Sequence, residues 1–387
     1  MLSGLSWMNS EHREPIPVLL LVRALGIGGT ERQLVETARF LQRDRFIPHV
    51  ACFRPDGLRR GDLERDCIPI LHLPVYSFKS PGVLKAASQL IRYIRQRHIQ
   101  IVHSFDAPLN VFAVPVARLA GTPAVISSQR GHRDLTGPGF KRLLRVTDHL
   151  ADAVIVNCQW MKRYLVEEEH VPEHKVRLCY NAVDLDRYGR RVVSRSAVGL
   201  TIGTVCALRP EKGVETLIQA FAKLRHTGAR LVILGSGPEE AKLRELCAKL
   251  GVEADCHFEP ATADVAEWLS RIDIFVLPSR SEALSNALME AMACGCCPVA
   301  SRVGGNPELV EDGKNGLLFE VDDCADLACQ LGELLTDEPR RKRFAEASLA
   351  KISAQFTPEK VAHAMQEIYE SVLSGVEAAH HPSTYDG

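Results

Sequence analysis

The chain alternates short apolar runs with longer stretches in which apolar residues recur at helical spacing. In the first half the apolar runs have the length of strands and span residues 18–22, 48–53, 99–104, 124–128, 153–156 and 176–179. A second series begins at residues 200–205 and continues through 230–234, 273–278 and 297–300. Strands that alternate with helices form parallel sheets with helices on both faces. The pattern therefore predicts an α/β protein of two Rossmann-like, doubly wound domains.

A polar and basic segment without helical periodicity separates the two series. It predicts a linker at residues 191–199, between an N-terminal domain of residues 16–190 and a C-terminal domain of residues 200–357. Residues 358–375 have apolar positions at helical spacing and predict a last helix. Residues 1–15 and 376–387 are expected to be flexible tails. Ligands of open α/β sheets bind beyond the carboxyl ends of the strands, so two such sheets facing each other would enclose a central cleft.

The composition is that of a soluble globular enzyme: 387 residues, 46% hydrophobic, 25% charged, with a formal net charge of −1. The lack of a basic excess argues against nucleic acid as a partner. No apolar run approaches the ~20 residues that span a bilayer, and residues 1–15 lack the pattern of a signal peptide, so a cytoplasmic location is expected. The twelve cysteines are predicted to be reduced, and Cys294-x-x-Cys297 lacks the second pair that a zinc site would need.

Residues 278–310 combine chemistry that suits a sugar nucleotide. Two carboxylates, Glu282 and Glu290, can accept hydrogen bonds from sugar and ribose hydroxyls. A helix is predicted to begin near Ser285, and the free N–H groups and dipole of its first turn favour a diphosphate. A glycine-rich turn follows at residues 304–308. The segment therefore predicts a binding site for a nucleotide-diphosphate sugar.

This segment resembles the donor-binding signature of the retaining glycosyltransferases of family four: an acid, seven residues, a second acid, then Gly-Gly-x-x-Glu. The resemblance extends over residues 16–373 and implies the GT-B fold, whose last helix crosses back to the first domain. It implies that Glu282 contacts the transferred sugar and that Glu290 binds the ribose. The other donor-binding residues that it implies are Leu284, Ser285, Asn286, Gly304, Gly305 and Glu308. The chain departs from the family at Ala283 and Leu284, where glycine and phenylalanine are usual.

Two cations, Arg209 and Lys212, follow the first strand of the second half. Cleavage of a sugar–phosphate bond leaves extra negative charge on the nucleoside diphosphate, which Arg209 could grip bidentately and Lys212 could neutralise as a point charge. A nucleotide-diphosphate sugar is therefore the expected donor, without a metal cofactor, and the family resemblance implies that it is a UDP- or GDP-sugar. Two glycine-rich loops are similar to family loops near the diphosphate and the nucleotide, and they supply Gly28, Gly29, Gly235 and Gly237.

The catalytic candidates of the first domain, His103, Gln129 and Arg130, follow or end its strands. Relatives often have a histidine where this chain has Gln129, which could still hydrogen-bond a sugar hydroxyl, and Arg130 could bind a phosphate. His103 is either a cleft residue or a buried structural histidine. Asp184-x-Asp186 could suggest a metal-bound sugar nucleotide, but its position before the linker favours a structural turn.

Residues 140–150 have the pattern of an amphipathic helix. One predicted face carries Phe140, Leu143, Leu144, Thr147 and Leu150, and the cations away from it are Lys141, Arg142 and Arg145. Both an ordinary surface helix and an interfacial membrane helix have this pattern. The family resemblance implies a glycan or a lipid-linked acceptor, and peripheral contact with the inner face of the membrane.

The sequence therefore predicts a retaining glycosyltransferase that moves a sugar from a UDP- or GDP-sugar to an acceptor hydroxyl, in the synthesis of a cell-surface polysaccharide or glycolipid. Three alternatives remain open. A sugar-nucleotide epimerase of the same fold would use the donor without an acceptor, and a non-catalytic protein would only bind the donor. A glycan phosphorylase would need a lysine site for pyridoxal phosphate, for which the sequence gives no support.

Overall fold

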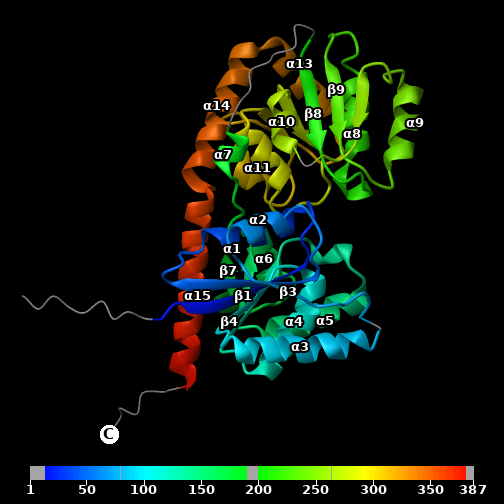
Figure 1. Ribbon diagram of the computed structural model, residues 1–387. Helices are drawn as coiled ribbons and strands as arrows, with labels where there is room; N and C mark the ends of the chain where they lie inside the picture. Colours follow the sequence, from blue (N-terminus) through cyan, green and yellow to red (C-terminus); the bar gives the residue numbers. More distant parts are fainter. Residues whose placement is uncertain (1–13, 79, 190–198, 263, 381–387) are drawn as a thin grey trace, which may run out of the picture.

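The fold consists of two α/β domains, one above the other in Figure 1. The computed structural model describes residues 14–78, 80–189, 199–262 and 264–380. Most of the linker expected at residues 191–199, and most of the tails expected at 1–15 and 376–387, lie outside these residues. Each domain has one parallel sheet with helices on both of its faces, which confirms the predicted α/β class.

The N-terminal domain is built on a seven-stranded parallel sheet in the order β3-β2-β1-β4-β5-β6-β7. Its strands are β1 (Ile16–Ala24), β2 (Phe46–Arg54), β3 (Ile70–His72), β4 (Ile101–Ser104), β5 (Ala124–Gln129), β6 (Ala153–Val156) and β7 (Val176–Leu178). β1 pairs with both β2 and β4, so that Leu20 lies opposite Val50 on one side and His103 on the other. The order of strands reverses at this point, which is where doubly wound sheets bind ligands.

Helices cover both faces of this sheet. They are α1 (Gly29–Phe40), α2 (Arg60–Arg65), α3 (Gly82–Gln96), α4 (Ala107–Ala120), α5 (Pro138–Leu150) and α6 (Gln159–Glu167). The short helix α7 (Leu185–Tyr188) instead packs against α11 (Asn286–Ala293) of the C-terminal domain. Successive residues of a strand point to opposite faces. Leu20 of β1 therefore packs with Leu34 of α1, and Leu21 packs with Leu90 of α3 and Ala113 of α4.

The C-terminal domain repeats the architecture with a six-stranded sheet in the order β10-β9-β8-β11-β12-β13. Its strands are β8 (Thr201–Val205), β9 (Arg230–Leu234), β10 (Cys256–Glu259), β11 (Ile274–Leu277), β12 (Cys297–Ser301) and β13 (Leu317–Phe319). Its helices are α8 (Val214–Ala222), α9 (Glu240–Leu250), α10 (Val265–Ser270), α11 (Asn286–Ala293), α12 (Asn306–Leu309), α13 (Cys324–Thr336) and α14 (Glu338–Gln355). α8, α9 and α13 share one face of the sheet, whereas α10, α11 and α14 pack on the other.

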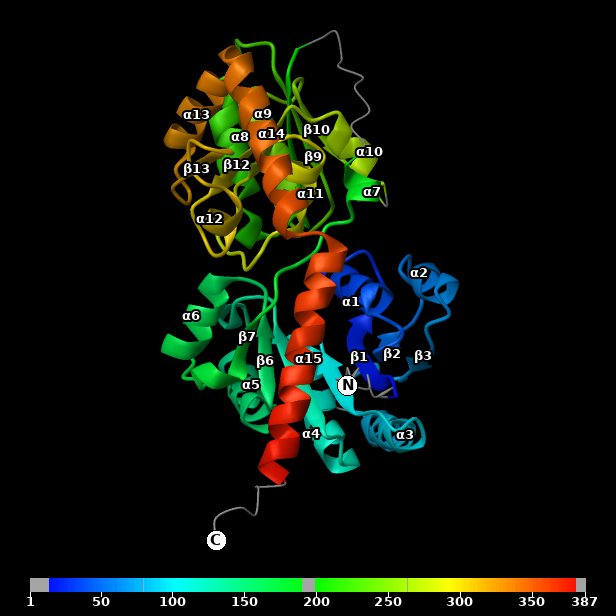
Figure 2. The ribbon, with the colours of Figure 1, turned by 90° about the vertical axis from the view of Figure 1, so that its left-hand side faces the viewer.

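The last helix, α15 (Pro358–His380), leaves the C-terminal domain and runs along the N-terminal domain, as Figures 1 and 2 show. Its residues Met365 and Tyr369 join the core that α1 and β1 form. The hydroxyl of Tyr369, a fully buried residue, lies 2.8 Å from Nδ1 of His103. The chain thus returns to its first domain, and the helix continues to His380, beyond the end expected at residue 375.

A buried ion pair joins the two domains. Arg32 of α1 contacts the carboxylate of Glu290 of α11, and their side chains are only 9% and 4% exposed. The guanidinium of Arg32 also lies 5.4 Å from the centre of the ring of Tyr188, the last residue of α7. Removing one member of a buried ion pair leaves the other charge without a partner, which costs about 3–5 kcal/mol. This contact therefore resists separation of the domains.

Glu36 lies one turn further along α1 and completes this cluster. Burial raises the pKa of Glu36 from its ordinary value of 4.5 to about 7, although Arg32 and Arg59 oppose the shift. Its Oε2 atom is buried without a hydrogen-bond partner in the part of the chain that the structure describes. Glu36 therefore changes its charge near neutral pH, next to the ion pair that joins the domains.

Glu36→Gln should stabilise the protein above about pH 7 and have little effect below about pH 4.5. The folded state holds the extra proton between these two pH values, so the parent protein loses stability as the pH rises through this window. The neutral amide avoids the loss, which is at most about 3 kcal/mol. The apparent Tm of both proteins should be followed across the window. A Tm difference that does not widen with rising pH would contradict the assignment.

Candidate functional site

A pocket of about 450 Å³ lies between the domains, at the carboxyl ends of both sheets. The segments that follow β1, β5, β6 and β7 form its N-terminal wall, and the segments that follow β8 and β11, with the start of α11, form its C-terminal wall. The predicted site residues that line it are Gly29, Arg130, Arg209, Lys212, Glu282, Leu284, Ser285 and Asn286. The fold therefore brings candidates from both halves of the sequence into one space.

Lys212 and Glu282 face each other on the C-terminal wall. Nζ of Lys212 lies 2.6 Å from Oε1 of Glu282, which also accepts a hydrogen bond of 2.8 Å from Oγ of Ser279. Burial alone lowers the pKa of Lys212, but the carboxylate of Glu282 outweighs burial and raises that pKa overall. The pair therefore places a fixed positive charge and a carboxylate side by side on the pocket wall.

Arg209 stands on the same wall, closer to solvent. Its side chain is 62% exposed, and its contact with Glu211 is a loose one of 3.9 Å. Arg209 precedes a short 3-10 helix, Pro210–Lys212, and Lys212 is its last residue. Both side chains line the pocket. Arg209 can therefore turn toward an anion in the pocket without breaking a strong ion pair.

Gly304 and Gly305 support the Glu282 loop from behind and do not line the pocket themselves. Gly304 has a φ of +56°, and a Cβ atom there would collide with the carbonyl oxygen of Glu282. The N–H of Gly305 donates to the oxygen of Ala283 at 2.7 Å, where a Cβ would also collide. Glycine alone permits this approach of two backbones. The two glycines therefore position the backbone of Glu282.

Gly235 and Gly237 act in a similar way on the loop that carries Arg209. Gly235 has a φ of +147°, and a Cβ atom there would collide with the carbonyl oxygen of Cys206, a residue of the pocket. A Cβ atom at Gly237 would collide with the carbonyl oxygen of Leu208. Neither glycine lines the pocket, so their effect on its wall is indirect, through the backbone of Cys206 and Leu208.

Helix α11 begins at the pocket, with Leu284, Ser285 and Asn286 on its wall. Oγ of Ser285 accepts a hydrogen bond of 3.3 Å from the N–H of Leu288 and caps the helix. Free N–H groups in the first turn of a helix, together with its dipole, favour a bound anion. The helix start therefore adds an anion-binding element beside Lys212 and Arg209.

Asn286 and Gly29 bring the two domains into direct contact at the pocket. Oδ1 of Asn286 accepts hydrogen bonds of 3.0 Å from Asn181 and 3.2 Å from Gln33, both in the N-terminal domain. A Cβ atom at Gly29 would meet the side-chain amide of Asn286, which would have to move to make room for it. Gly28, the residue before it, does not line the pocket.

Glu290 and Glu308, two predicted donor ligands, contact the opposite domain and do not line the pocket. Glu290 is the partner of Arg32. The carboxylate of Glu308 accepts hydrogen bonds of 2.9 and 3.0 Å from the first two N–H groups of α6, and one of 3.1 Å from the hydroxyl of Tyr180. In this arrangement both acids hold the domains together, which differs from the ligand contacts predicted for them.

Arg130 is the cation of the N-terminal wall. Its Nη1 donates a hydrogen bond of 2.7 Å to Asn181, and its guanidinium lies 4.8 Å from the centre of the Phe105 ring. Burial lowers the pKa of Arg130 to about 10, so the side chain still carries its charge at neutral pH. Positive charge therefore faces the pocket from both domains.

Gln129 and His103 do not reach the pocket. Gln129 is 3% exposed, and its Oε1 accepts a hydrogen bond of 3.1 Å from Arg133. His103 is fully buried, with one ring nitrogen 2.8 Å from the hydroxyl of Tyr369 and the other 2.8 Å from that of Ser128. Both side chains bind partners outside the pocket in this arrangement, which for His103 agrees with the alternative of a buried structural histidine. Their catalytic role stays a prediction.

Four polar residues of the pocket were not predicted from the sequence as site residues: Thr30, Gln33, Asn157 and Asn181. A signal was available for Asn157, because it directly follows the strand predicted at residues 153–156. The carboxyl ends of parallel strands are where α/β proteins bind ligands, so a polar residue at such an end is a candidate by position alone.

The two other motifs with possible metal chemistry are structural. Oδ1 of Asp184 accepts hydrogen bonds from the N–H groups of Asp186 (2.9 Å) and Arg187 (3.3 Å) and caps α7. Cys294 and Cys297 are buried, free thiols. Among the residues that the structure describes, no cluster of three or more His, Cys, Asp or Glu side chains could hold a metal ion.

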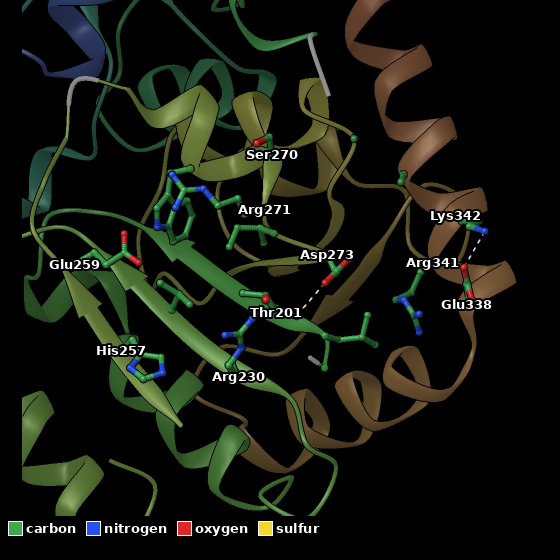
Figure 3. A pocket seen from close by; sticks show the side chains of 17 residues that line it. Thr201, Arg230, His257, Glu259, Ser270, Arg271, Asp273, Glu338, Arg341 and Lys342 are labelled. Atoms are coloured by element: carbon green, nitrogen blue, oxygen red, sulfur yellow. Dashed lines mark hydrogen bonds and ion pairs between the residues drawn. The ribbon is translucent and has the colours of Figure 1, made fainter. Parts of the chain in front are cut away.

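A second cavity, of about 470 Å³, lies within the C-terminal domain. Figure 3 shows residues of its walls, among them Arg230 and Glu259 on the strands and Arg341 and Lys342 on α14. It mixes positive and negative side chains, and none of the predicted site residues lines it. The interdomain pocket therefore remains the site to which the sequence and the structure both point.

Comparisons with known proteins identify the family. Residues 198–350 match the family described as "Glycosyl transferases group 1", and residues 27–187 match "Glycosyltransferase Family 4". The lipopolysaccharide core biosynthesis glycosyltransferase LpsE of Rhizobium meliloti is 32% identical over 357 residues, which cover 91% of this chain and 94% of LpsE. The N-acetyl-alpha-D-glucosaminyl L-malate synthase of Bacillus anthracis is 28% identical, over 76% of this chain and 80% of that protein.

The fold is also that of solved glycosyltransferases. Anabaena HepE, in a crystal structure with UDP and glucose, superposes with a TM-score of 0.82 at 22% sequence identity, over 92% of this chain and 99% of HepE. Both family matches, one in each domain, agree with this two-domain architecture. The chain belongs to the group 1 glycosyltransferases of family four and has the GT-B fold.

Proposed function

We propose that the protein is a retaining glycosyltransferase that moves a sugar from a UDP- or GDP-sugar to an acceptor hydroxyl. The observation that carries the proposal is the meeting of Lys212, Glu282 and Arg209 with the first turn of α11 in one pocket. Cations and free N–H groups suit a diphosphate, and a carboxylate suits the hydroxyls of the attached sugar. The UDP and glucose bound in the HepE crystal structure fit such a donor, and the name of LpsE fits a glycosyltransferase.

In the proposed reaction, the bond between the anomeric carbon and the diphosphate oxygen breaks, and its electron pair leaves with the nucleoside diphosphate. The acceptor oxygen forms the new bond on the same face of the sugar, and its proton passes to the departing phosphate oxygen. Lys212 and Arg209 stabilise the charge that develops on the leaving group. No enzymic nucleophile is required, which is consistent with the burial of Gln129 and His103.

We propose that the enzyme works without a metal ion, because cationic side chains already stand where a metal would offset the charge of the diphosphate. Contacts between the domains serve the same reaction. The pairs formed by Glu290 and Glu308 with the N-terminal domain keep both walls together, which limits the access of water to the donor. Cell-surface polysaccharide or glycolipid synthesis is the setting that the name of LpsE favours.

Release of a nucleoside diphosphate from a panel of UDP- and GDP-sugars tests the proposed function. We expect release from at least one donor in the presence of a glycan or lipid-linked acceptor, with transfer of the sugar and the same rate in EDTA. Isomerisation of the donor sugar without transfer would favour an epimerase. Binding without turnover would favour a non-catalytic protein, and dependence on manganese would contradict the metal-free mechanism.

Lys212→Met and Glu282→Gln should each lower kcat by about 100-fold or more, because each removes a charge that faces the reacting groups. Lys242→Met is the matched control, since Lys242 is 74% exposed on α9 and lies outside the pocket. Steady-state release of the nucleoside diphosphate and the Tm of each variant should be measured. Turnover like that of the parent in both pocket variants would remove Lys212 and Glu282 from the donor site.

We also propose that α5 contacts a membrane peripherally, through a face that differs from the predicted one. Leu144 and Thr147 are buried against the domain, whereas Leu143 (49% exposed), Val146 (56%) and Leu150 (36%) face solvent. Leu119, on the neighbouring helix α4, is 71% exposed. Within the described residues, no helix is long and apolar enough to cross a membrane.

Anionic liposomes should retain the protein at low salt, and Leu143→Ser combined with Val146→Ser should reduce the retained fraction several-fold. Exposed apolar side chains of an amphipathic helix bury themselves among lipid headgroups, and serine removes that gain. Leu84→Ser, at a residue of α3 that is 74% exposed, is the control. Cosedimentation with vesicles measures retention. Equal loss in the control variant, or no retention of the parent, would refute the contact.

A further inference from the structure

Asn157 is a polar residue of the pocket whose side-chain oxygen has no hydrogen-bond partner among the described residues. It follows β6, is 2% exposed and lines the N-terminal wall. Its Oδ1 atom is buried, and no described residue donates a hydrogen bond to it. A buried polar atom without a partner costs about 1–3 kcal/mol. A ligand in the pocket that donates a hydrogen bond would remove this cost.

Arg130 carries a complementary atom next to it. Its Nε is buried and has no hydrogen-bond partner among the described residues, while Nη1 is already bound to Asn181. Gln129 of β5 is in register with Val156 of β6, so the residues that follow them, Arg130 and Asn157, are neighbours at the ends of adjacent strands. One acceptor atom and one donor atom are therefore both buried and unpaired on the same wall.

The C-terminal wall differs in this respect. Lys212 and Glu282 already bind each other there, Arg209 is exposed to solvent, and this wall also has the first turn of α11 for the donor diphosphate. The unpaired atoms thus lie across the pocket from the proposed donor site. A second substrate that entered from the N-terminal side would meet them first.

We propose that Asn157 and Arg130 form the acceptor subsite, and that they bind two neighbouring hydroxyls of a sugar or another polyol. This rests on the proposed function. A hydroxyl both donates and accepts hydrogen bonds, so one can donate to Oδ1 of Asn157 while the next accepts from Nε of Arg130. The reacting hydroxyl gives its proton to the departing phosphate. The hydroxyl held by Asn157 is therefore an adjacent one, and Asn157 orients the acceptor.

The test compares Asn157→Leu, which has a similar size but no acceptor atom, with Asn157→Asp, which keeps an acceptor oxygen. Binding of methyl hexopyranosides and myo-inositol should be followed by saturation-transfer NMR on the full chain, in the presence of UDP or GDP. Calorimetry with UDP and GDP alone measures the donor side. The Tm of each variant reports whether it is folded.

We expect at least one of these polyols to bind the parent and Asn157→Asp, and to bind Asn157→Leu about tenfold more weakly or not at all, which corresponds to about 1.4 kcal/mol. Affinity for the nucleoside diphosphate should stay within about twofold in all three proteins. Equal polyol binding by Asn157→Leu would overturn the proposal, as would a failure of every polyol to bind the parent. An equal loss of nucleotide affinity would place Asn157 in the donor site.

The donor panel keeps the two proposals distinguishable. If no donor releases a nucleoside diphosphate with any acceptor, the proposed function fails, whatever the NMR shows. If release occurs, Asn157→Leu should raise the KM for the acceptor and leave the KM for the donor unchanged. A fall in kcat with an unchanged acceptor KM would instead indicate a structural role for Asn157 and would reject the acceptor subsite.

Discussion

The contact between the two domains is the constraint on which the rest of the structure depends. Each domain forms only one wall of the pocket, and each contributes cations: Arg130 comes from the first domain, and Lys212 and Arg209 come from the second. The walls are held together by the buried pair of Glu290 and Arg32, by the partly buried contacts of Glu308 with the start of α6, and by an apolar cluster that contains residues of both domains. A buried charge tolerates little displacement from its partner, so the pair of Arg32 and Glu290 limits how far the walls can move apart.

The three acids of the segment at residues 278–310 have two different roles in the structure. Glu282 faces the pocket, while Glu290 and Glu308 face the other domain. Glu36, beside Arg32, adds a group whose charge changes near neutral pH, so the charge of the interface varies with pH while Arg130 and Lys212 in the pocket keep their charge. The stability of the closed arrangement and the chemistry of the pocket thus depend on adjacent stretches of the same chain.

The central strands could be predicted from the sequence, and several short or weakly patterned elements could not. β1 and β11 are buried on both faces and read as continuous apolar runs. β3 and β13 have three residues each at the edges of their sheets, too few to show a period. α14 was missed for another reason: most of its residues are polar, so its buried stripe is narrow.

Site residues could be predicted where their role depends on neighbours in the sequence, but not where it depends on residues far away in the chain. Lys212, Glu282 and Ser285 could be identified because their roles depend on loops and a helix start that lie nearby in the sequence. The contacts of His103 and Glu308 could not, because Tyr369 is 266 residues from His103 and the start of α6 is about 150 residues before Glu308. A motif names the residue types of a site, whereas tertiary packing decides which of them remain open to a ligand.

The return of α15 to the first domain has a consequence for biosynthesis. During translation the N-terminal domain leaves the ribosome first, yet Met365 and Tyr369, which belong to its core, are made only after the C-terminal domain. Until they arrive, β1 and α1 keep an apolar surface uncovered and His103 lacks one of its two partners. Nascent chains that stop before α15 would expose this surface to chaperones and proteases, so synthesis of α15 is a condition for the maturation of the first domain.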